Sequence, residues 1–179
     1  MSRWFAAAGN ALPGENGIKL FADENNSRVL KQAGNGTALV SSLKSHLARA
    51  DAGDYCALLA YIAQNEEYRS VLQDIRAIIL DRKGVATCLG FGPRFLHSTG
   101  QAYKGGPNTG VFLQITAEHA ADIAVPGHGY SFGAVIDATA RGDFAVLNER
   151  GRRALRVHLG VDVAQGLARL KDAVKQALA

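Results

Sequence analysis

The chain has 179 residues, of which 47% are hydrophobic and 20% are charged, as is typical of one folded globular domain. This composition excludes a disordered or fibrous protein, and the length leaves little room for a second core. Lys and Arg exceed Asp and Glu by 20 to 16, and the resulting net charge of +4 favours anionic ligands such as phosphorylated metabolites.

Several partner classes are disfavoured by the distribution of residues along the chain. No apolar run reaches the roughly 18 residues that cross a bilayer, so no membrane partner is expected. The basic residues form no long run, and the sequence contains no aromatic RNA-binding motif. Nucleic acid is therefore less favoured as a partner than a phosphorylated metabolite. We expect a soluble, cytoplasmic protein.

The first 36 residues are expected to form a lead-in to the domain. Residues 1–8 lack the length and the hydrophobic middle of a secretory signal. Residues 9–17 and 34–36 are rich in Asn, Gly and Pro, and between them the pattern predicts one short strand over 18–22. The domain itself is predicted over residues 37–179.

From residue 37 onward, helical and strand patterns alternate. Thr37 is the expected N-cap of a helix that runs to residue 49, because Leu39, Val40, Leu43 and Leu47 recur at helical spacing. A continuous apolar run over 55–62 predicts a strand buried on both faces. Asn65 is the expected N-cap of the following helix, and Gly84 is expected to end it.

The same alternation continues to the C-terminus. The patterns predict strands over 86–90, 111–116 and 155–159 and helices over 97–104, 131–148 and 163–178. Strands that alternate with helices through right-handed crossovers build a parallel sheet with helices on both faces. The sequence therefore predicts a three-layer α/β fold with a mainly parallel sheet of about five strands.

The segment after the strand at 86–90 carries the densest group of polar side chains. Ligands of such sheets bind beyond the carboxyl ends of the strands. Gly90 and Gly92 allow a sharp turn there and Pro93 stiffens its exit. The candidate ligand contacts that follow are Arg94, His97, Ser98, Gln101 and Lys104, and the spacing of His97, Gln101 and Lys104 predicts that they share one helix face.

The other histidines have less support as functional groups. His46 and His119 are expected to be solvated surface residues, and His158 lies in a strand, where packing explains it better. His128 is an intermediate case in its glycine-containing loop. The histidines and carboxylates do not cluster at metal-ligand spacing, so no metal is expected.

The two cysteines are expected to be structural. Cys56 and Cys88 lie inside apolar runs and lack the CxxC spacing of metal or redox motifs. Buried, reduced thiols in a cytoplasmic protein account for both.

Two stretches resemble a known family. The run LHSTGQ over 96–101, followed by Gly105 and Gly106, resembles the His-Ser-x-x-Gln element in the C-terminal sugar-isomerase (SIS) domain of phosphoglucose isomerases. The run YSFG over 130–133 is similar to a second element of that domain. Together with the segments that follow it, residues 90–116 look most like the isomerase half of bacterial transaldolase/phosphoglucose-isomerase fusion proteins.

The resemblance implies a flavodoxin-like SIS fold and a role in interconverting glucose 6-phosphate and fructose 6-phosphate. In that family the histidine that matches His97 assists opening of the sugar ring, and a glutamate then moves a proton between C1 and C2. An imidazole suits ring opening because it donates and accepts protons near neutral pH. Such a proton transfer needs no redox cofactor. The family also implies a homodimer.

Parts of the family's apparatus have no match in this chain. Between Asp74 and His97 the only carboxylate is Asp81, which is expected to lie at a solvated helix end. The phosphate-binding Ser/Thr loop is absent, and Gly151, Arg152 and Arg153 occupy about the place of a late catalytic lysine. We therefore expect a phosphate-loop SIS domain, from the same gene or another chain, to complete the site.

Two other functions remain open. The chain could bind a sugar phosphate without catalysis, through Arg94, Lys104 and the backbone amides at the start of the His97 helix. Alternatively, it could be a structural or assembly domain that uses the fold alone.

Overall fold

The structure is a computed structural model that describes residues 10–31 and 37–179. The expectations for residues 1–8 and 34–36 concern residues outside these ranges. Within them, no helix is both long enough and apolar enough to cross a membrane.

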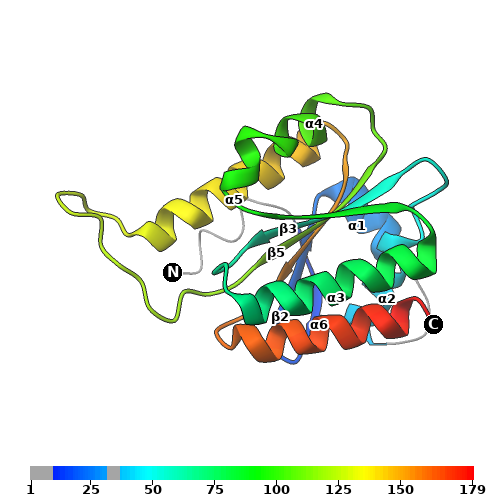
Figure 1. The fold of residues 1–179 in the computed structure, drawn as a ribbon, viewed down its shortest axis with the longest axis horizontal. Coiled ribbons are helices and arrows are strands. Elements are labelled where there is room, and N and C mark those ends of the chain that lie inside the picture. The colour runs from blue at the N-terminus through cyan, green and yellow to red at the C-terminus, as the bar shows by residue number, and fades with distance from the viewer. Residues whose placement is uncertain (1–9, 32–36) are drawn as a thin grey trace.

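A six-stranded mixed sheet forms the centre of the molecule (Figure 1). Its strands are β1 (Asn10–Glu15), β2 (Ile18–Ala22), β3 (Tyr55–Tyr61), β4 (Ala86–Phe91), β5 (Gly110–Thr116) and β6 (Arg153–His158), in the spatial order β1-β2-β6-β5-β3-β4. The four strands β4, β3, β5 and β6 run parallel, whereas β2 pairs antiparallel with β6 and β1 with β2. The prediction of a mainly parallel α/β sheet is confirmed, with one strand more than expected.

Helices cover both faces of this sheet. They are α1 (Glu24–Lys31), α2 (Ala38–Leu47), α3 (Glu66–Lys83), α4 (Thr99–Gly105), α5 (Phe132–Glu149) and α6 (Val163–Ala177). Figure 1 shows α4 and α5 on one face and α2, α3 and α6 on the other, so the helices and the sheet form three layers.

The predicted helix caps are present. The Thr37 side chain accepts a hydrogen bond from the Val40 amide, and the Asn65 side chain accepts one from the Tyr68 amide. Gly84 ends α3 in the left-handed region, at a φ of 64°, where a side chain would be strained. These local signals explain why most helix boundaries could be predicted.

The lead-in differs from its prediction. Residues 10–31 form two strands and a helix instead of one strand, and Leu12, Ile18, Leu20 and Leu30 belong to the main core. The strand β1 has only one buried side chain, Leu12, so its sequence carries no strand-like apolar pattern. The described part of the lead-in is therefore built into the same sheet as the rest.

The two faces of the sheet bury different side chains. The face below α2, α3 and α6 is aliphatic, and it includes Leu58, Ile75 and Leu170. The face below α4 and α5 is aromatic, with members Tyr61, Phe95, Tyr103, Phe112 and Phe144. Buried polar groups accompany the aromatic side. Arg156, for example, donates to the Gln114 side chain (2.6 Å) and lies 4.5 Å above the centre of the Phe144 ring.

His46 is fully buried, so the expectation of a solvated residue is wrong. Its Nε2 lies 3.0 Å from the Phe112 carbonyl oxygen, which can only accept a hydrogen bond, so Nε2 carries the proton. Burial, reinforced by the nearby Arg49 charge, lowers the pKa of His46 to about 3. The helical pattern of α2 predicted Leu43 and Leu47 as buried but did not reveal that His46 shares their side.

The buried imidazole predicts that stability falls in mild acid. Below the ordinary histidine pKa of about 6.5, His46 binds a proton in the unfolded chain but stays neutral in the folded chain. The free energy of unfolding therefore decreases as pH falls from about 6.5 toward 3. From pH 7 to pH 5 the loss from this group is about 2 kcal/mol. Urea unfolding at both pH values should show this extra loss in the unmodified chain but not in His46→Leu. A matched exposed variant, His128→Leu, should keep it, and equal losses in all three proteins would contradict the assignment.

Candidate functional site

The carboxyl ends of the parallel strands meet at one edge of the sheet. Four loops leave this edge, at residues 62–65, 92–93, 117–131 and 159–162. The loop at 117–131 projects well beyond the other three (Figure 1). Because ligands of open α/β sheets bind beyond this edge, it is the first place to look for a site.

The loop after β4 is held tightly against β3. The Gly92 amide donates to the Ala60 carbonyl (2.8 Å), and a Cβ on Gly92 would lie 2.4 Å from a carbon of the Tyr61 ring. Phe95 is buried against Gly90 and Gly100 and meets Tyr61 edge-on at 5.5 Å. The glycines are thus needed for close aromatic packing, which fixes where the following residues emerge.

His97 lies at the surface of this loop. It ends a short 3-10 helix, Arg94–His97, and both Arg94 and His97 are exposed. Within residues 10–31 and 37–179 neither side chain has a hydrogen bond or an ion pair. The imidazole is therefore open to solvent and to a ligand at this edge.

The predicted common helix face is wrong. Ser98, at φ −137° and ψ −105°, separates the 3-10 helix from α4, so His97 does not continue the helix that carries Gln101 and Lys104. Ser98 Oγ donates to the Phe95 carbonyl (3.3 Å), and Gln101 Nε2 donates to the Leu96 carbonyl (2.9 Å). Both polar side chains stabilise the loop that presents His97.

Lys104 forms an ion pair with a buried aspartate. Its Nζ lies 2.7 Å from Asp143 Oδ1 of α5, and the Asp143 side chain is only 2% exposed. Burial, and the neighbouring Asp143 carboxylate, raise the pKa of Tyr61. The ammonium thus neutralises a buried carboxylate and joins α4 to α5, which leaves Arg94 as the open cation of the predicted group.

The same edge holds a second group of ionisable side chains around β5 and β6. Thr116 Oγ1 and His158 Nδ1 lie 3.0 Å apart, and His158 Nε2 is 3.9 Å from Glu118 Oε1. Burial and the Lys19 charge lower the pKa of His158, although Glu118 opposes this shift. Packing was the expected role of His158, and its burial confirms it.

His119 was expected to be solvated, but it is partly buried and its Nε2 lies 3.1 Å from Asp137 Oδ1. The sequence separations of these pairs, 18 residues for His119 and Asp137 and 42 for Thr116 and His158, hide them from motif analysis. The signal that the sequence offered was the place of Glu118 and His119 directly after the strand β5, where ligand-binding residues of such sheets lie.

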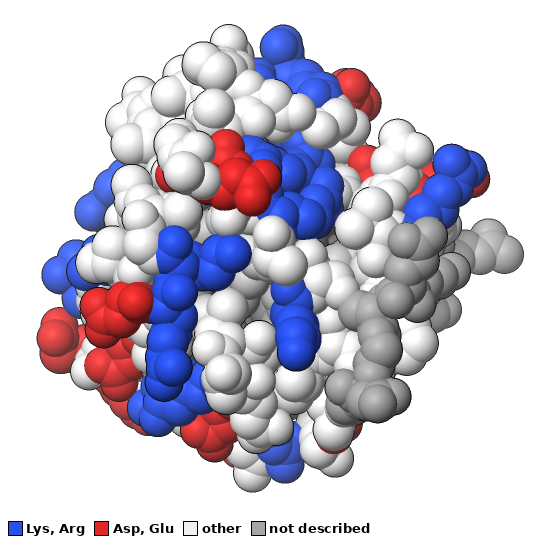
Figure 2. Space-filling model, turned by 90° about the vertical axis from the view of Figure 1, so that its right-hand side faces the viewer, with Lys and Arg blue, Asp and Glu red and all other residues white. Residues whose placement is uncertain are grey.

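Arg152 and Arg153 lie at the opposite end of the sheet, where β6 begins. Arg152 donates to the carbonyl oxygens of Lys104 and Gly106, and Arg153 contacts Asp54 at 2.7 Å. Figure 2 views this end of the molecule and shows basic side chains with acidic ones among them. These arginines bind loops together and are remote from the His97 edge.

The described residues contain no group of three or more histidine, cysteine or acidic side chains that could hold a metal. Both cysteines are free; Cys56 is buried, as expected, whereas Cys88 is partly exposed. The expectation of a buried Cys88 is therefore wrong.

Comparisons with known proteins give a fold but no family. No family model matches the chain, and no curated protein matches it. Among solved structures the chain is similar to the hypothetical protein TT0462 from Thermus thermophilus, with a TM-score of 0.65 and 16% identity. The likeness covers 79% of this chain and 39% of that chain, so it extends over about two fifths of the longer protein.

The Lys104–Asp143 pair predicts a large effect of removing the ammonium. Lys104→Met leaves a buried carboxylate without its counter-ion and should lower the free energy of unfolding by about 3 kcal/mol, measured by urea unfolding. The double variant Lys104→Met/Asp143→Asn should recover much of that loss. Lys171→Met breaks the more exposed pair with Asp74 and should cost under about 1 kcal/mol. Equal losses for the two lysine variants would contradict a structural role of Lys104.

Proposed function

We propose that this chain is an SIS domain of the phosphoglucose isomerase type and that it supplies the group that opens the sugar ring. The exposed His97 imidazole, at the carboxyl end of β4 on a rigidly packed loop, is the observation that carries the proposal. Fixed placement matters because a proton donor acts only within hydrogen-bond reach of the reacting oxygen.

Ring opening requires one proton to move in each direction. The C1–O5 bond breaks, the ring oxygen gains a proton and the C1 hydroxyl loses one. An imidazole at position 97 can give the first of these protons and, through water, take back the second. The Arg94 guanidinium, three residues away and also exposed, is suited to hold the substrate's phosphate or a hydroxyl.

The second step, proton transfer between C1 and C2, needs a carboxylate base. Asp81 is unsuited, because it lies in the last turn of α3, which leads to the amino end of β4. Glu66 and Glu67 at the start of α3, and Glu118 after β5, are the acidic residues nearest in the chain to the carboxyl ends of β3 and β5. With Lys104 committed to Asp143, the phosphate site is also incomplete, which supports completion by a phosphate-loop domain.

The second candidate function is sugar-phosphate binding without turnover. The observation in its favour is that Arg94 is an open cation beside His97, while no carboxylate contacts that imidazole within the described parts of the chain. A module of this kind would bind the same ligand and would not need a base.

The test measures conversion of fructose 6-phosphate to glucose 6-phosphate. The chain is assayed alone and after mixing with a protein that carries a phosphate-loop SIS domain, and His97→Ala is assayed beside it. We expect turnover on mixing and a loss of at least about a hundredfold in His97→Ala, as is usual when a general acid is removed. His128→Ala, which removes another exposed histidine, is the matched control and should keep full activity.

Two outcomes would contradict the proposed isomerase. Turnover that survives His97→Ala would remove the imidazole from the reaction. If fructose 6-phosphate raises the melting temperature of the chain but no mixture turns it over, the binding module is the better account.

A further inference from the structure

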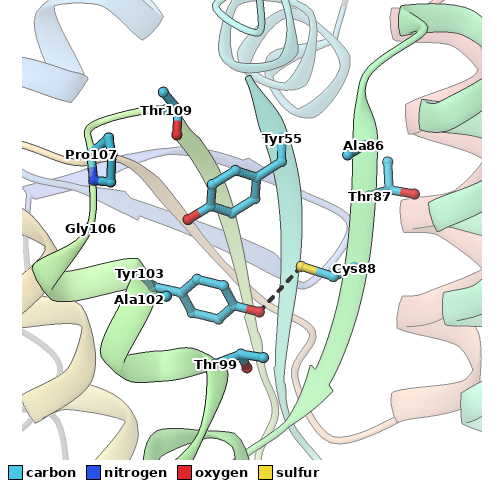
Figure 3. Close-up of a pocket in the computed structure, with 10 residues that line it drawn as sticks. All are labelled: Tyr55, Ala86, Thr87, Cys88, Thr99, Ala102, Tyr103, Gly106, Pro107 and Thr109. Atoms are coloured by element: carbon cyan, nitrogen blue, oxygen red, sulfur yellow. Dashed lines mark hydrogen bonds between the residues drawn. The ribbon is translucent and has the colours of Figure 1, made fainter. Parts of the chain in front are cut away.

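A pocket lies at the other end of the strands from His97. It has a volume of about 430 Å³ and is lined by ten residues from the starts of β3 and β4, from α4 and from the segment that joins α4 to β5 (Figure 3). Thr99, two residues after His97, is the lining residue nearest in the chain to the site proposed above, and most of the lining comes from the amino ends of β3 and β4 and the far end of α4. The chemistry of the pocket is also different from that of the His97 edge.

The lining is apolar and uncharged. None of the ten lining residues is acidic or basic, and the polar groups among them are hydroxyls and a thiol, on residues such as Tyr55, Thr99 and Cys88. Burial raises the pKa values of Tyr55 and Cys88, so both groups remain neutral at physiological pH. The nearest guanidinium groups already have partners, since Arg76 donates to the Thr87 hydroxyl and Arg152 donates to two backbone carbonyls. A phosphate or carboxylate ligand would therefore be desolvated without a cationic side chain in direct contact, which is unfavourable.

Two phenol rings are among the lining groups. The rings of Tyr55 and Tyr103 lie 6.0 Å apart at an interplanar angle of 33°, and Figure 3 shows one above the other. Tyr55 also meets Phe112 edge-on at 5.9 Å. Flat aromatic walls favour a flat aromatic ligand, because offset and edge-on ring contacts add to the burial of apolar area.

Hydrogen bonds hold the elements around the pocket in place. Tyr103 Oη and Cys88 Sγ lie 3.2 Å apart and link α4 to β4. Arg152 donates to the carbonyls of Lys104 and Gly106, which fixes the turn on the opposite side. The side chain of Asn108 donates to the Gly151 carbonyl (3.2 Å) and anchors the same turn. Little ordering is therefore left for a ligand to induce.

We propose that this pocket binds a neutral aromatic small molecule of one or two fused rings carrying a hydroxyl group. The volume lies at the lower end of the roughly 300–1,000 Å³ of ligand pockets, which matches a molecule of that size. The hydroxyls of Tyr55 and Thr109, which also line the pocket, offer partners for one polar substituent.

The test uses 2-naphthol as the probe and titration calorimetry at pH 7 as the readout. The unmodified chain should bind 2-naphthol in one saturable site. Ala102→Phe places a ring on an exposed helix position that lines the pocket, and it should weaken binding at least tenfold. Ala164→Phe adds the same ring at an exposed position of α6, on the other face of the sheet, and should bind as the unmodified chain does.

A second measurement does not depend on substitutions. Cys88 lines the pocket and is partly exposed, whereas Cys56 is buried, so iodoacetamide at pH 8.5 should alkylate Cys88 first. Saturating 2-naphthol should slow that alkylation at least fivefold, and naphthalene-2-sulfonate at the same concentration should not. Unchanged alkylation with 2-naphthol, or equal affinities of Ala102→Phe and Ala164→Phe, would overturn the proposal. Neither result depends on whether the isomerase assay succeeds.

Discussion

Burial of β3 on both faces is the constraint on which the rest of the structure depends. Every residue from Cys56 to Tyr61 is buried, so β3 must lie in the interior of the sheet with helices on both sides. The two ends of this strand then determine what surrounds them. Tyr61 packs on Gly92 and positions the His97 loop, while Tyr55 forms a wall of the pocket at the opposite end.

The two faces of the sheet differ in the kind of side chain that they bury. The side covered by α2, α3 and α6 is almost purely aliphatic, and it provides most of the apolar burial. The side covered by α4 and α5 contains the buried Asp143 and Arg156 and the aromatic cluster. Buried charges need fixed partners, so this side is held in one arrangement by Lys104, Gln114 and the Phe144 ring.

Local signals explain which elements the sequence could predict. Thr37, Asn65 and Gly84 mark helix ends by side-chain chemistry or backbone freedom, and the apolar run of β3 needs no tertiary context. In contrast, β1 could not be predicted, because Leu12 is its one buried side chain and a single apolar residue makes no strand pattern. The role of Lys104 and the contact of His119 with Asp137 depend on helix α5 folding back over the sheet, which no short-range pattern reports.

The N-terminal hairpin of β1 and β2 protects the edge of the parallel part of the sheet. β2 covers the outer edge of β6, and Asn26 of α1 donates to the carbonyl of Arg152, the residue that also holds the turn after α4. A chain shortened to begin at residue 37 would keep the pairing of β6 with β5 but leave the backbone groups on the other edge of β6 without their partners from β2. Such a bare strand edge invites pairing with other molecules, so self-assembly into aggregates is the expected fate of that shorter polypeptide.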